Sequence, residues 1–304
     1  MKLGYFADGP WSHKAFEMII NDKRFEILFV VSRFSKPDLV LKKFAESNNI
    51  DFLVFENINS DATVSLLKDY HADLFVSMSY DQIIKEDLLK LPPKGFINCH
   101  AGALPFYRGR NVLNWVLING ESEFGITVHY IDEGIDTGDI ILQKRYPIYL
   151  SDNYNTLLEK SYNYCSDLLM KSLVMIFNDK VIRIKQIDID SKGSYYQRRL
   201  PGDEMIDWDL ESKKIHNFVR GITFPGPCAR TFYDTNEIMI IKSELIAEKI
   251  ETDSKNGTVL KSQKGKFLVK TKDACLLVSN FLFIDDKKID IKAGKLLKDK
   301  KSKF

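Results

Sequence analysis

The sequence predicts a doubly wound α/β domain with a mostly parallel sheet, followed by a smaller β-rich domain. Two observations support this prediction. Short apolar runs alternate with amphipathic helical stretches up to residue 100, and short β-rich runs predominate from residue 229 onward. Alternation of strands with helices is typical of a parallel sheet covered by helices on both faces. We therefore expect a first domain over residues 1–200 and a second over residues 201–304.

The first five expected strands are short apolar runs. They span Leu3–Ala7, Ile27–Val31, Phe52–Phe55, Leu74–Met78 and Phe96–Cys99. Amphipathic helical stretches separate them, near residues 12–21, 38–48, 61–70 and 82–90. Ligands of such sheets bind beyond the carboxyl ends of the strands. The segment that follows the fifth strand is therefore the expected place of a functional site.

The later elements follow from the same patterns. Gly125–Ile131 predicts another strand, residues 153–178 a long helix, and residues 195–203 a linker between the domains. The second domain is expected to contain strands at Glu237–Ile241, Gly257–Leu260, Phe267–Thr271 and Cys275–Phe283.

Composition limits the class of protein. With 304 residues, 44% hydrophobic and 28% charged, the chain has the make-up of a soluble globular protein. Its four cysteines are far apart, which excludes a CxxC redox pair and a zinc framework and indicates a reducing, cytoplasmic setting. No apolar run approaches the roughly 20 residues of a membrane span, so we expect neither a signal peptide nor a membrane partner. The formal net charge of +2 argues against a nucleic-acid partner.

An amide, an imidazole and a carboxylate are expected to converge after the fifth strand. Side chains two apart on a strand share a face, so Asn98 and His100 point together while Cys99 faces away. The glycine-broken acidic loop 132–139 can bring Asp136 beside His100. Attack of an amine on an acyl carbon creates an oxyanion and releases a proton. We expect Asn98 to stabilise the oxyanion, His100 to accept the proton and Asp136 to orient His100, although Asp136 is an alternative acceptor.

Other chemistries fit these residues less well. Asp132, Asp136 and Asp139 lack the alternating acids and terminal glutamate of a calcium loop, so no metal is expected. His129 is expected to serve its strand, because alternation places it on one face with Thr127. A histidine such as His100, taken alone, is more often a hydrogen-bonded core residue, and only its neighbours argue for catalysis.

The turn after the first strand is a candidate substrate contact. Gly9 and Trp11 lie between that strand and the following helix, where backbone N–H groups can meet a phosphate or a sugar. The glycine spacing differs from GxGxxG, which excludes a dinucleotide-binding loop. Arg198 and Arg220 are candidates for binding a pyrophosphate, since a guanidinium offers paired donors to phosphate oxygens.

The motifs around the expected site resemble those of the folate-dependent formyltransferases. The resemblance rests on Asn98-Cys-His100, on the turn Leu104-Pro105-Phe-Tyr107-Arg108-Gly109, and on the acidic loop with Asp136-Thr-Gly138. It extends to residues 76–83 and, in the C-terminal part, to Arg198-Arg-Leu-Pro, Ile206-Asp-Trp208, His216-Asn-x-Val-Arg220 and Pro225-Gly-Pro. It implies a Rossmann-like formyltransferase fold, and it covers most of the chain.

The resemblance also implies a co-substrate and its contacts. It implies that 10-formyltetrahydrofolate donates the formyl group and leaves as tetrahydrofolate. The expected folate contacts are Met78, Ser79, Tyr80, Gln82, Ile83, Asp132 and Gly134. Tyr107 and Arg108 of the shared turn are expected to contact the acceptor substrate. No metal is implied.

Within that family the sequence most resembles the nucleotide-sugar N-formyltransferases. The acceptor implied is the amine of a nucleotide-linked amino sugar, favoured as a dTDP-linked 3- or 4-amino dideoxyhexose, with the carrier and the amine position left open. One alternative is a methionyl-tRNA formyltransferase, but no basic insertion is evident between residues 31 and 38. Another is a non-catalytic protein that binds folate or a nucleotide sugar. Relatives of this kind are mostly dimers, so a homodimer is expected.

Overall fold

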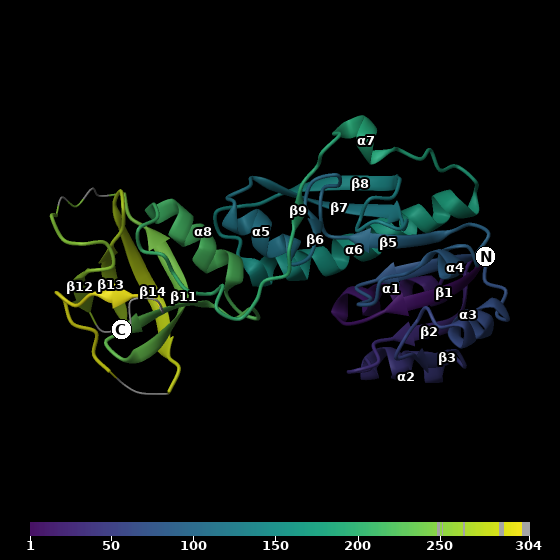
Figure 1. Ribbon diagram of the computed structural model, residues 1–304, viewed down its shortest axis with the longest axis horizontal. Helices are drawn as coiled ribbons and strands as arrows, with labels where there is room; N and C mark the ends of the chain where they lie inside the picture. Colours follow the sequence, from purple (N-terminus) through teal and green to yellow (C-terminus); the bar gives the residue numbers. More distant parts are fainter. Residues whose placement is uncertain (248–249, 251, 264, 286–288, 300–304) are drawn as a thin grey trace. The chain divides into compact units, whose positions relative to one another are not determined.

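The chain is described from a computed structural model. The structure describes residues 1–247, 250, 252–263, 265–285 and 289–299. Figure 1 shows the order of the helices and strands along the chain.

The first sheet has seven strands in the order β3-β2-β1-β4-β5-β7-β8. They are β1 (Lys2–Ala7), β2 (Glu26–Ser32), β3 (Asp51–Val54), β4 (Leu74–Met78), β5 (Phe96–His100), β7 (Glu123–Tyr130) and β8 (Ile140–Pro147). Strands β1 to β5 pair in parallel with their neighbours, whereas β7 runs antiparallel beside β5. The prediction of a mostly parallel sheet is confirmed.

Helices connect many of these strands, and further helices follow β8 along the chain. They are α1 (Pro10–Ile20), α2 (Leu39–Ser47), α3 (Asp61–Lys68), α4 (Glu86–Leu89), α5 (Val112–Ile118), α6 (Tyr154–Phe177), α7 (Gln186–Ile189) and α8 (Ser212–Ile222). Side chains cap two of the helix starts. Asp38 Oδ1 accepts from Val40 N and Leu41 N in α2, and Ser60 Oγ accepts from Thr63 N in α3.

The helix expected over residues 82–90 is shorter than predicted. Only Glu86–Leu89 is helical. The Gln82 carboxamide accepts from Ile58 N and donates to Phe55 O, both at 2.9 Å. These two long-range hydrogen bonds fix the segment before α4 against the chain that follows β3, so the apolar periodicity there does not produce a helix.

Aromatic rings fill the core between the first strands. Phe6 of β1 is fully buried, and its ring centroid lies 4.8 Å from that of Phe96 on β5 and 5.1 Å from that of Phe75 on β4. The ring of Tyr80, just beyond β4, also packs edge-on against Phe6. The core therefore holds the carboxyl end of β4 and the loop that leaves it.

The second sheet has six strands in the order β12-β13-β14-β11-β10-β15. They are β10 (Ala229–Tyr233), β11 (Asn236–Leu245), β12 (Val259–Gln263), β13 (Lys266–Lys270), β14 (Cys275–Phe283) and β15 (Leu297–Lys298). Every recorded pairing among them is antiparallel. Ile215, Val219 and Ile222 of α8 share a buried cluster with residues of this sheet. The predicted β-rich C-terminal part is confirmed.

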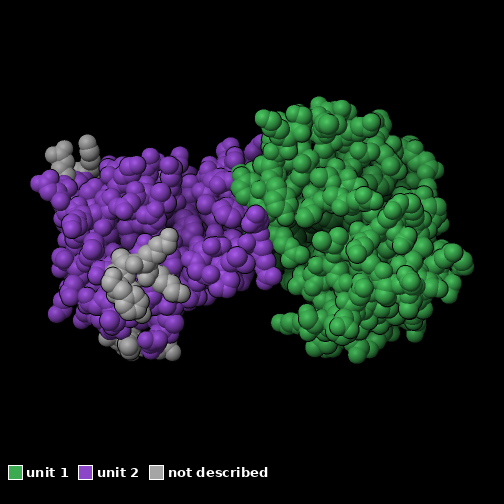
Figure 2. Space-filling view, viewed as in Figure 1, with its two compact units in different colours: residues 1–112, 124–146, 159–196 green, residues 113–123, 147–158, 197–304 purple. Residues whose placement is uncertain are grey.

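The chain divides into two compact units, coloured separately in Figure 2. The first consists of Met1–Val112, Phe124–Tyr146 and Glu159–Tyr196. The second consists of Leu113–Glu123, Pro147–Leu158 and Gln197–Phe304. The second unit is thus built from three separate segments of the chain, and α5 belongs to it together with α8.

Candidate active site

The candidate site lies at the carboxyl end of β5 in the first unit. Asn98 and His100 share one face of this strand, while the Cys99 thiol points away and lies 3.6 Å from the carbonyl oxygen of Cys165 on α6. Strand β7 pairs with β5 so that His129 is opposite Asn98 and Thr127 is opposite His100. Polar side chains of two neighbouring strands therefore meet on one side of the sheet.

Both ring nitrogens of His100 have partners. Its Nε2 lies 2.7 Å from the carbonyl oxygen of Tyr107, and since a carbonyl only accepts, Nε2 carries a hydrogen. Its Nδ1 lies 3.6 Å from Asp136 Oδ2. The His100 side chain is only 8% exposed, so a second proton on Nδ1 would create an ion pair shielded from water. The structure thus places Asp136 beside His100, as the sequence analysis expected.

His129 is a site residue that the sequence analysis assigned only to its strand. Its Nδ1 lies 2.7 Å from the carbonyl oxygen of Tyr130, which places a hydrogen on that nitrogen. Its Nε2 lies 3.5 Å from Asp136 Oδ1 and 3.4 Å from Asn98 Nδ2. Alternation correctly grouped His129 with Thr127, but the pairing of β7 beside β5 was needed to show that this face belongs to the site.

Asp136 lies between the two histidines in a left-handed backbone conformation, with a φ of 55°. Burial alone would raise the pKa of its carboxyl group. The positive charge of His100, the hydrogen bond and charge of His129, and the hydrogen bond from Gly109 N at 2.9 Å outweigh burial and hold that pKa well below its usual range. Asp136 is therefore an ionised carboxylate at neutral pH.

The turn from Leu104 to Gly109 contacts His100 through the carbonyl oxygen of Tyr107. Tyr107 has a φ of 59°, and its ring stacks on that of Tyr196 at 4.8 Å between centroids. The short strands β6 (Arg108–Gly109) and β9 (Tyr195–Tyr196) pair in parallel and fix the turn. Gly102 leaves no room for a side chain, since a Cβ there would lie 2.5 Å from Tyr107 O and 2.6 Å from His100 Nε2. Backbone and imidazole are therefore in close contact at this point.

The residues expected to contact folate fall on two loops of the first unit. Met78 ends β4 and is buried, Ser79 has a φ of 64°, and the Ser79 carbonyl accepts from Arg33 Nη2 at 3.2 Å. Burial, followed by the negative charge of Asp81, raises the pKa of Tyr80. Ile83, at 67% exposed, presents an apolar surface to solvent. The loop is therefore held at both ends, by the Arg33 contact to Ser79 and by the hydrogen bonds of Gln82, while the Ile83 side chain is exposed.

Asp132 and Gly134 shape the second of these loops. Asp132 Oδ1 accepts from Thr137 Oγ1 at 2.6 Å and from Gly134 N at 3.1 Å. A Cβ at Gly134 would lie 2.0 Å from Thr137 Oγ1, so the close turn excludes larger residues. In this structure Asp132 stabilises the loop that carries Asp136.

The residues expected to contact the acceptor lie in both units. In the first unit the Gly9 N–H donates to Asp38 Oδ2 at 2.7 Å, so an anion bound at this turn would have to replace a carboxylate. The Trp11 ring packs edge-on against Tyr162 at 4.9 Å. In the second unit Arg198 is exposed, whereas Arg220 donates to Asn217 Oδ1 and to the carbonyl oxygen of Asp152. Burial lowers the pKa of Arg220.

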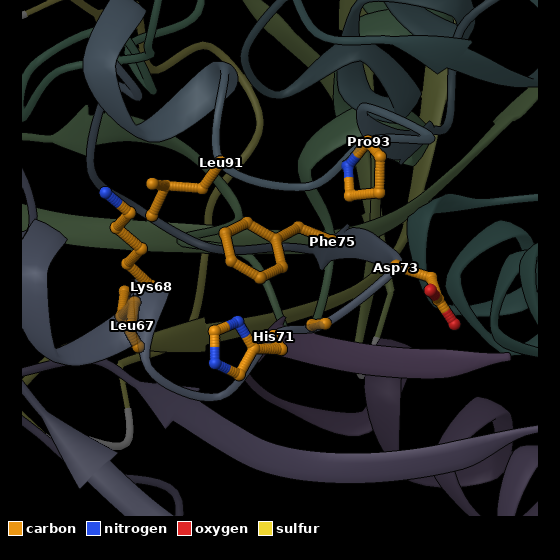
Figure 3. A pocket seen from close by; sticks show the side chains of 8 residues that line it. Leu67, Lys68, His71, Asp73, Phe75, Leu91 and Pro93 are labelled. Atoms are coloured by element: carbon orange, nitrogen blue, oxygen red, sulfur yellow. The ribbon is translucent and has the colours of Figure 1, made fainter.

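A cavity of about 280 Å³ in the first unit lies away from this site. It opens at the amino end of β4, where Figure 3 shows Leu91, Pro93 and His71 around the Phe75 ring. Strands β4 and β5 are parallel, so the amino end of β4 and the carboxyl end of β5 lie at opposite ends of the strands. This cavity therefore contributes nothing to the His100 site.

Neither a metal-binding cluster nor a membrane-spanning helix occurs among the described residues. Over the ranges that the structure describes, no group of three or more histidine, cysteine, aspartate or glutamate side chains is arranged to hold a metal ion. Among the same residues, no helix combines the length and the apolar character needed to cross a membrane.

Family models match both parts of the chain. The model described as formyl transferase matches residues 11–173, and the model described as formyl transferase, C-terminal domain, matches residues 200–295. Methionyl-tRNA formyltransferase of Fusobacterium nucleatum subsp. nucleatum is 30% identical over 98% of both chains. The bifunctional polymyxin resistance protein ArnA of Wigglesworthia glossinidia brevipalpis is 36% identical over 72% of this chain and 33% of that protein.

Solved structures show the same relationship. WlaRD, a sugar 3N-formyl transferase crystallised with dTDP and 5-N-formyl-THF, is 26% identical with a TM-score of 0.71, covering 93% of this chain and 98% of that one. A 4-N formyltransferase from Francisella tularensis is 25% identical with a TM-score of 0.64, covering 82% and 98%. These matches, together with the two family models, show that the chain belongs to the formyl transferase family and is a formyl-transferring enzyme.

Proposed function

We propose that this enzyme transfers a formyl group from 10-formyltetrahydrofolate to the amine of a nucleotide-linked amino sugar. The acceptor proposed first is a dTDP-linked 3- or 4-amino dideoxyhexose. The observation that carries the proposal is the likeness over almost the whole chain to WlaRD, a sugar 3N-formyl transferase whose structure was determined in the presence of dTDP and 5-N-formyl-THF. The likeness to a 4-N formyltransferase supports transfer of the formyl group to a nitrogen atom.

The connection between β2 and α2 supports a small acceptor over a transfer RNA. It spans residues 33–38, and its Arg33 is paired with Asp8, with 3.1 Å between Nε and Oδ2. Asp38, at the other end of the connection, binds Gly9 N and lies 2.8 Å from His13 Nε2. Carboxylates thus accompany Arg33 and His13, which is unfavourable for a polyanion.

The proposed reaction assigns one task to each catalytic residue. The neutral amine attacks the formyl carbon, and Asn98 Nδ2 donates to the oxyanion that forms. His100 accepts the amine proton at Nδ1, where the resulting imidazolium faces Asp136. The bond between the formyl carbon and the folate nitrogen then breaks, and that nitrogen receives the proton. The new carbon–nitrogen bond remains in the formamide product.

Methionyl-tRNA formylation is the second candidate function. The 30% identity with the Fusobacterium enzyme over 98% of both chains favours it. It predicts a rate that falls steeply with salt, because binding of a polyanion releases counterions.

A panel of acceptors tests the proposal. The protein is incubated with 10-formyltetrahydrofolate and, separately, with dTDP-, UDP- and GDP-linked 3- or 4-amino sugars and methionyl-tRNA. Mass spectrometry follows the gain of a formyl group. We expect product with a dTDP-linked amino sugar and no product with the H100A variant. Formylation of methionyl-tRNA alone would reject the sugar acceptor and establish the second candidate.

A further inference from the structure

A buried glutamine joins the two loops that carry the proposed catalytic groups. Gln186 is the first residue of α7 and is only 3% exposed. Its Oε1 accepts two hydrogen bonds from the Arg108 guanidinium, at 3.0 Å from Nε and 2.8 Å from Nη2. Its Nε2 donates to the carbonyl oxygens of Asp136 and Gly138, each at 2.8 Å. All four hydrogen-bonding positions of the carboxamide are therefore used.

These contacts form a closed ring around the catalytic carboxylate. Gln186 binds Arg108, the next residue Gly109 donates its N–H to Asp136 Oδ2 at 2.9 Å, and the backbone of Asp136 returns to Gln186. One arm of the ring thus holds the side chain of Asp136 and the other holds its carbonyl group. Because both arms start at one carboxamide, movement of Gln186 would change the direction of the carboxylate.

Asp136 has a left-handed backbone, with a φ of 55°. Residues other than glycine adopt this conformation uncommonly, although aspartate does so more readily than most, and here the contacts to its carboxylate and its carbonyl oxygen hold it in place. We infer that Gln186 is a positioning residue for formyl transfer, which holds the Asp136 carboxylate at His100 Nδ1. The inference rests on the role proposed above for Asp136.

The ring also accounts for Arg108. The guanidinium uses Nε and Nη2 on Gln186 and approaches the carbonyl oxygen of Lys192 with Nη1 at 3.5 Å. Its positive charge therefore strengthens the hydrogen bonds to the Gln186 oxygen. A glutamine that merely filled space would leave turnover unchanged when replaced by a residue of similar size, and this difference can be measured.

The Q186E variant separates the donor contacts of the Gln186 side chain from its acceptor contacts. A carboxylate still accepts from Arg108, but it cannot donate to the carbonyl oxygens of Asp136 and Gly138 and would repel them. We expect kcat to fall at least tenfold, with KM for 10-formyltetrahydrofolate within twofold of the wild-type value. The ratio of variant to wild-type kcat should rise as the pH is lowered, because a protonated carboxyl group regains one donor. The Q186M variant loses both the acceptor contacts and the donor contacts. It should show the same loss of kcat without the pH effect.

Asn114 provides a matched control. It is also 3% exposed, and its Nδ2 donates to the carbonyl oxygen of Gly221 at 2.7 Å in the second unit. The N114D variant makes the same change of amide to carboxylate, and we expect a kcat within twofold of wild type. Thermal unfolding of every variant checks that it is folded. The Q186E variant keeps the Arg108 contact and reports on the ring even where Q186M does not fold.

The outcomes separate this inference from the function on which it rests. Unchanged kcat in folded Q186E, with a D136N variant inactive, would overturn the positioning role alone. A raised KM with unchanged kcat would also overturn it, since Gln186 would then act on binding. A fully active D136N variant would instead reject the catalytic role proposed for Asp136.

Discussion

At the scale of single residues, the site is organised around one carboxylate between two buried imidazoles. Asp136 lies 3.6 Å from His100 Nδ1 and 3.5 Å from His129 Nε2. The other ring nitrogen of each histidine donates a hydrogen bond to a backbone carbonyl oxygen. The remaining nitrogen of each therefore faces Asp136, and a proton that arrives from the amine gains a stabilising partner at once.

This arrangement predicts a pH dependence of stability. The folded-state pKa of Asp136 is below its ordinary value of 3.8, so the carboxylate stabilises the folded protein above that pH and ceases to do so as the pH falls toward the folded-state pKa. We expect the free energy of unfolding of wild type to fall more steeply than that of D136N below about pH 5, by on the order of 1 kcal/mol at pH 3. Chemical denaturation from pH 7 to pH 3 measures the difference. Parallel pH curves for the two proteins would contradict it.

At the scale of elements, the close contact of β5 with the turn at residues 102–109 determines where His100 lies. Gly102 lies against both the imidazole and the carbonyl oxygen of Tyr107 to which that imidazole is hydrogen-bonded. Thr127 of β7 reinforces the contact, because its hydroxyl donates to Gly102 O at 2.6 Å and lies 3.3 Å from Leu104 N, which donates to it. Two strands and one turn thus fix a single ring.

The G102A variant tests this fixation. An added methyl group would lie 2.6 Å from His100 Nε2, so the ring or the turn must move. We expect kcat to fall at least tenfold and the variant to lose about 1–3 kcal/mol of stability, the usual cost of overpacking. Gly294 serves as a control for kcat, because nothing lies within 4 Å of its added Cβ and its φ of 82° adds backbone strain without crowding. A G294A variant with reduced kcat, or a G102A variant with wild-type kcat, would argue against this account.

Part of this site follows from the sequence and part does not. Alternation along β5 placed Asn98 and His100 on one face, and the glycine-broken loop supplied Asp136. His129 was not foreseen, because alternation within β7 does not reveal which strand lies beside it. Gln186 was not foreseen either, because its amide binds Arg108 and the backbone of Asp136 across 78 and 50 residues. Such contacts carry no local pattern.

At the scale of the molecule, the second unit depends on residues that precede the C-terminal part. Ile118 of α5 packs against the cluster formed by α8 and the six-stranded sheet. Asn114, also on α5, donates to the carbonyl oxygen of Gly221. The sequence analysis expected residues 1–200 to form a domain of their own, and a shortened chain tests that expectation.

A chain that ends at residue 200 should be less stable than the full protein. It keeps α5 but loses α8 and the sheet on which Ile118 packs, so apolar surface is exposed. We expect a lower unfolding temperature and strong binding of a hydrophobic dye such as ANS. Cooperative unfolding at the wild-type temperature without dye binding would show instead that residues 1–200 form a self-sufficient domain.

The three-segment construction of the second unit limits how genes of this family can recombine. A single crossover between two relatives near residue 200 would join α5 of one parent to α8 and the sheet of the other. The pair formed by Asn114 and the Gly221 carbonyl would then come from two lineages, as would the packing of Ile118. Chimaeras should therefore tolerate exchange only when all three segments, Leu113–Glu123, Pro147–Leu158 and Gln197–Phe304, are transferred together.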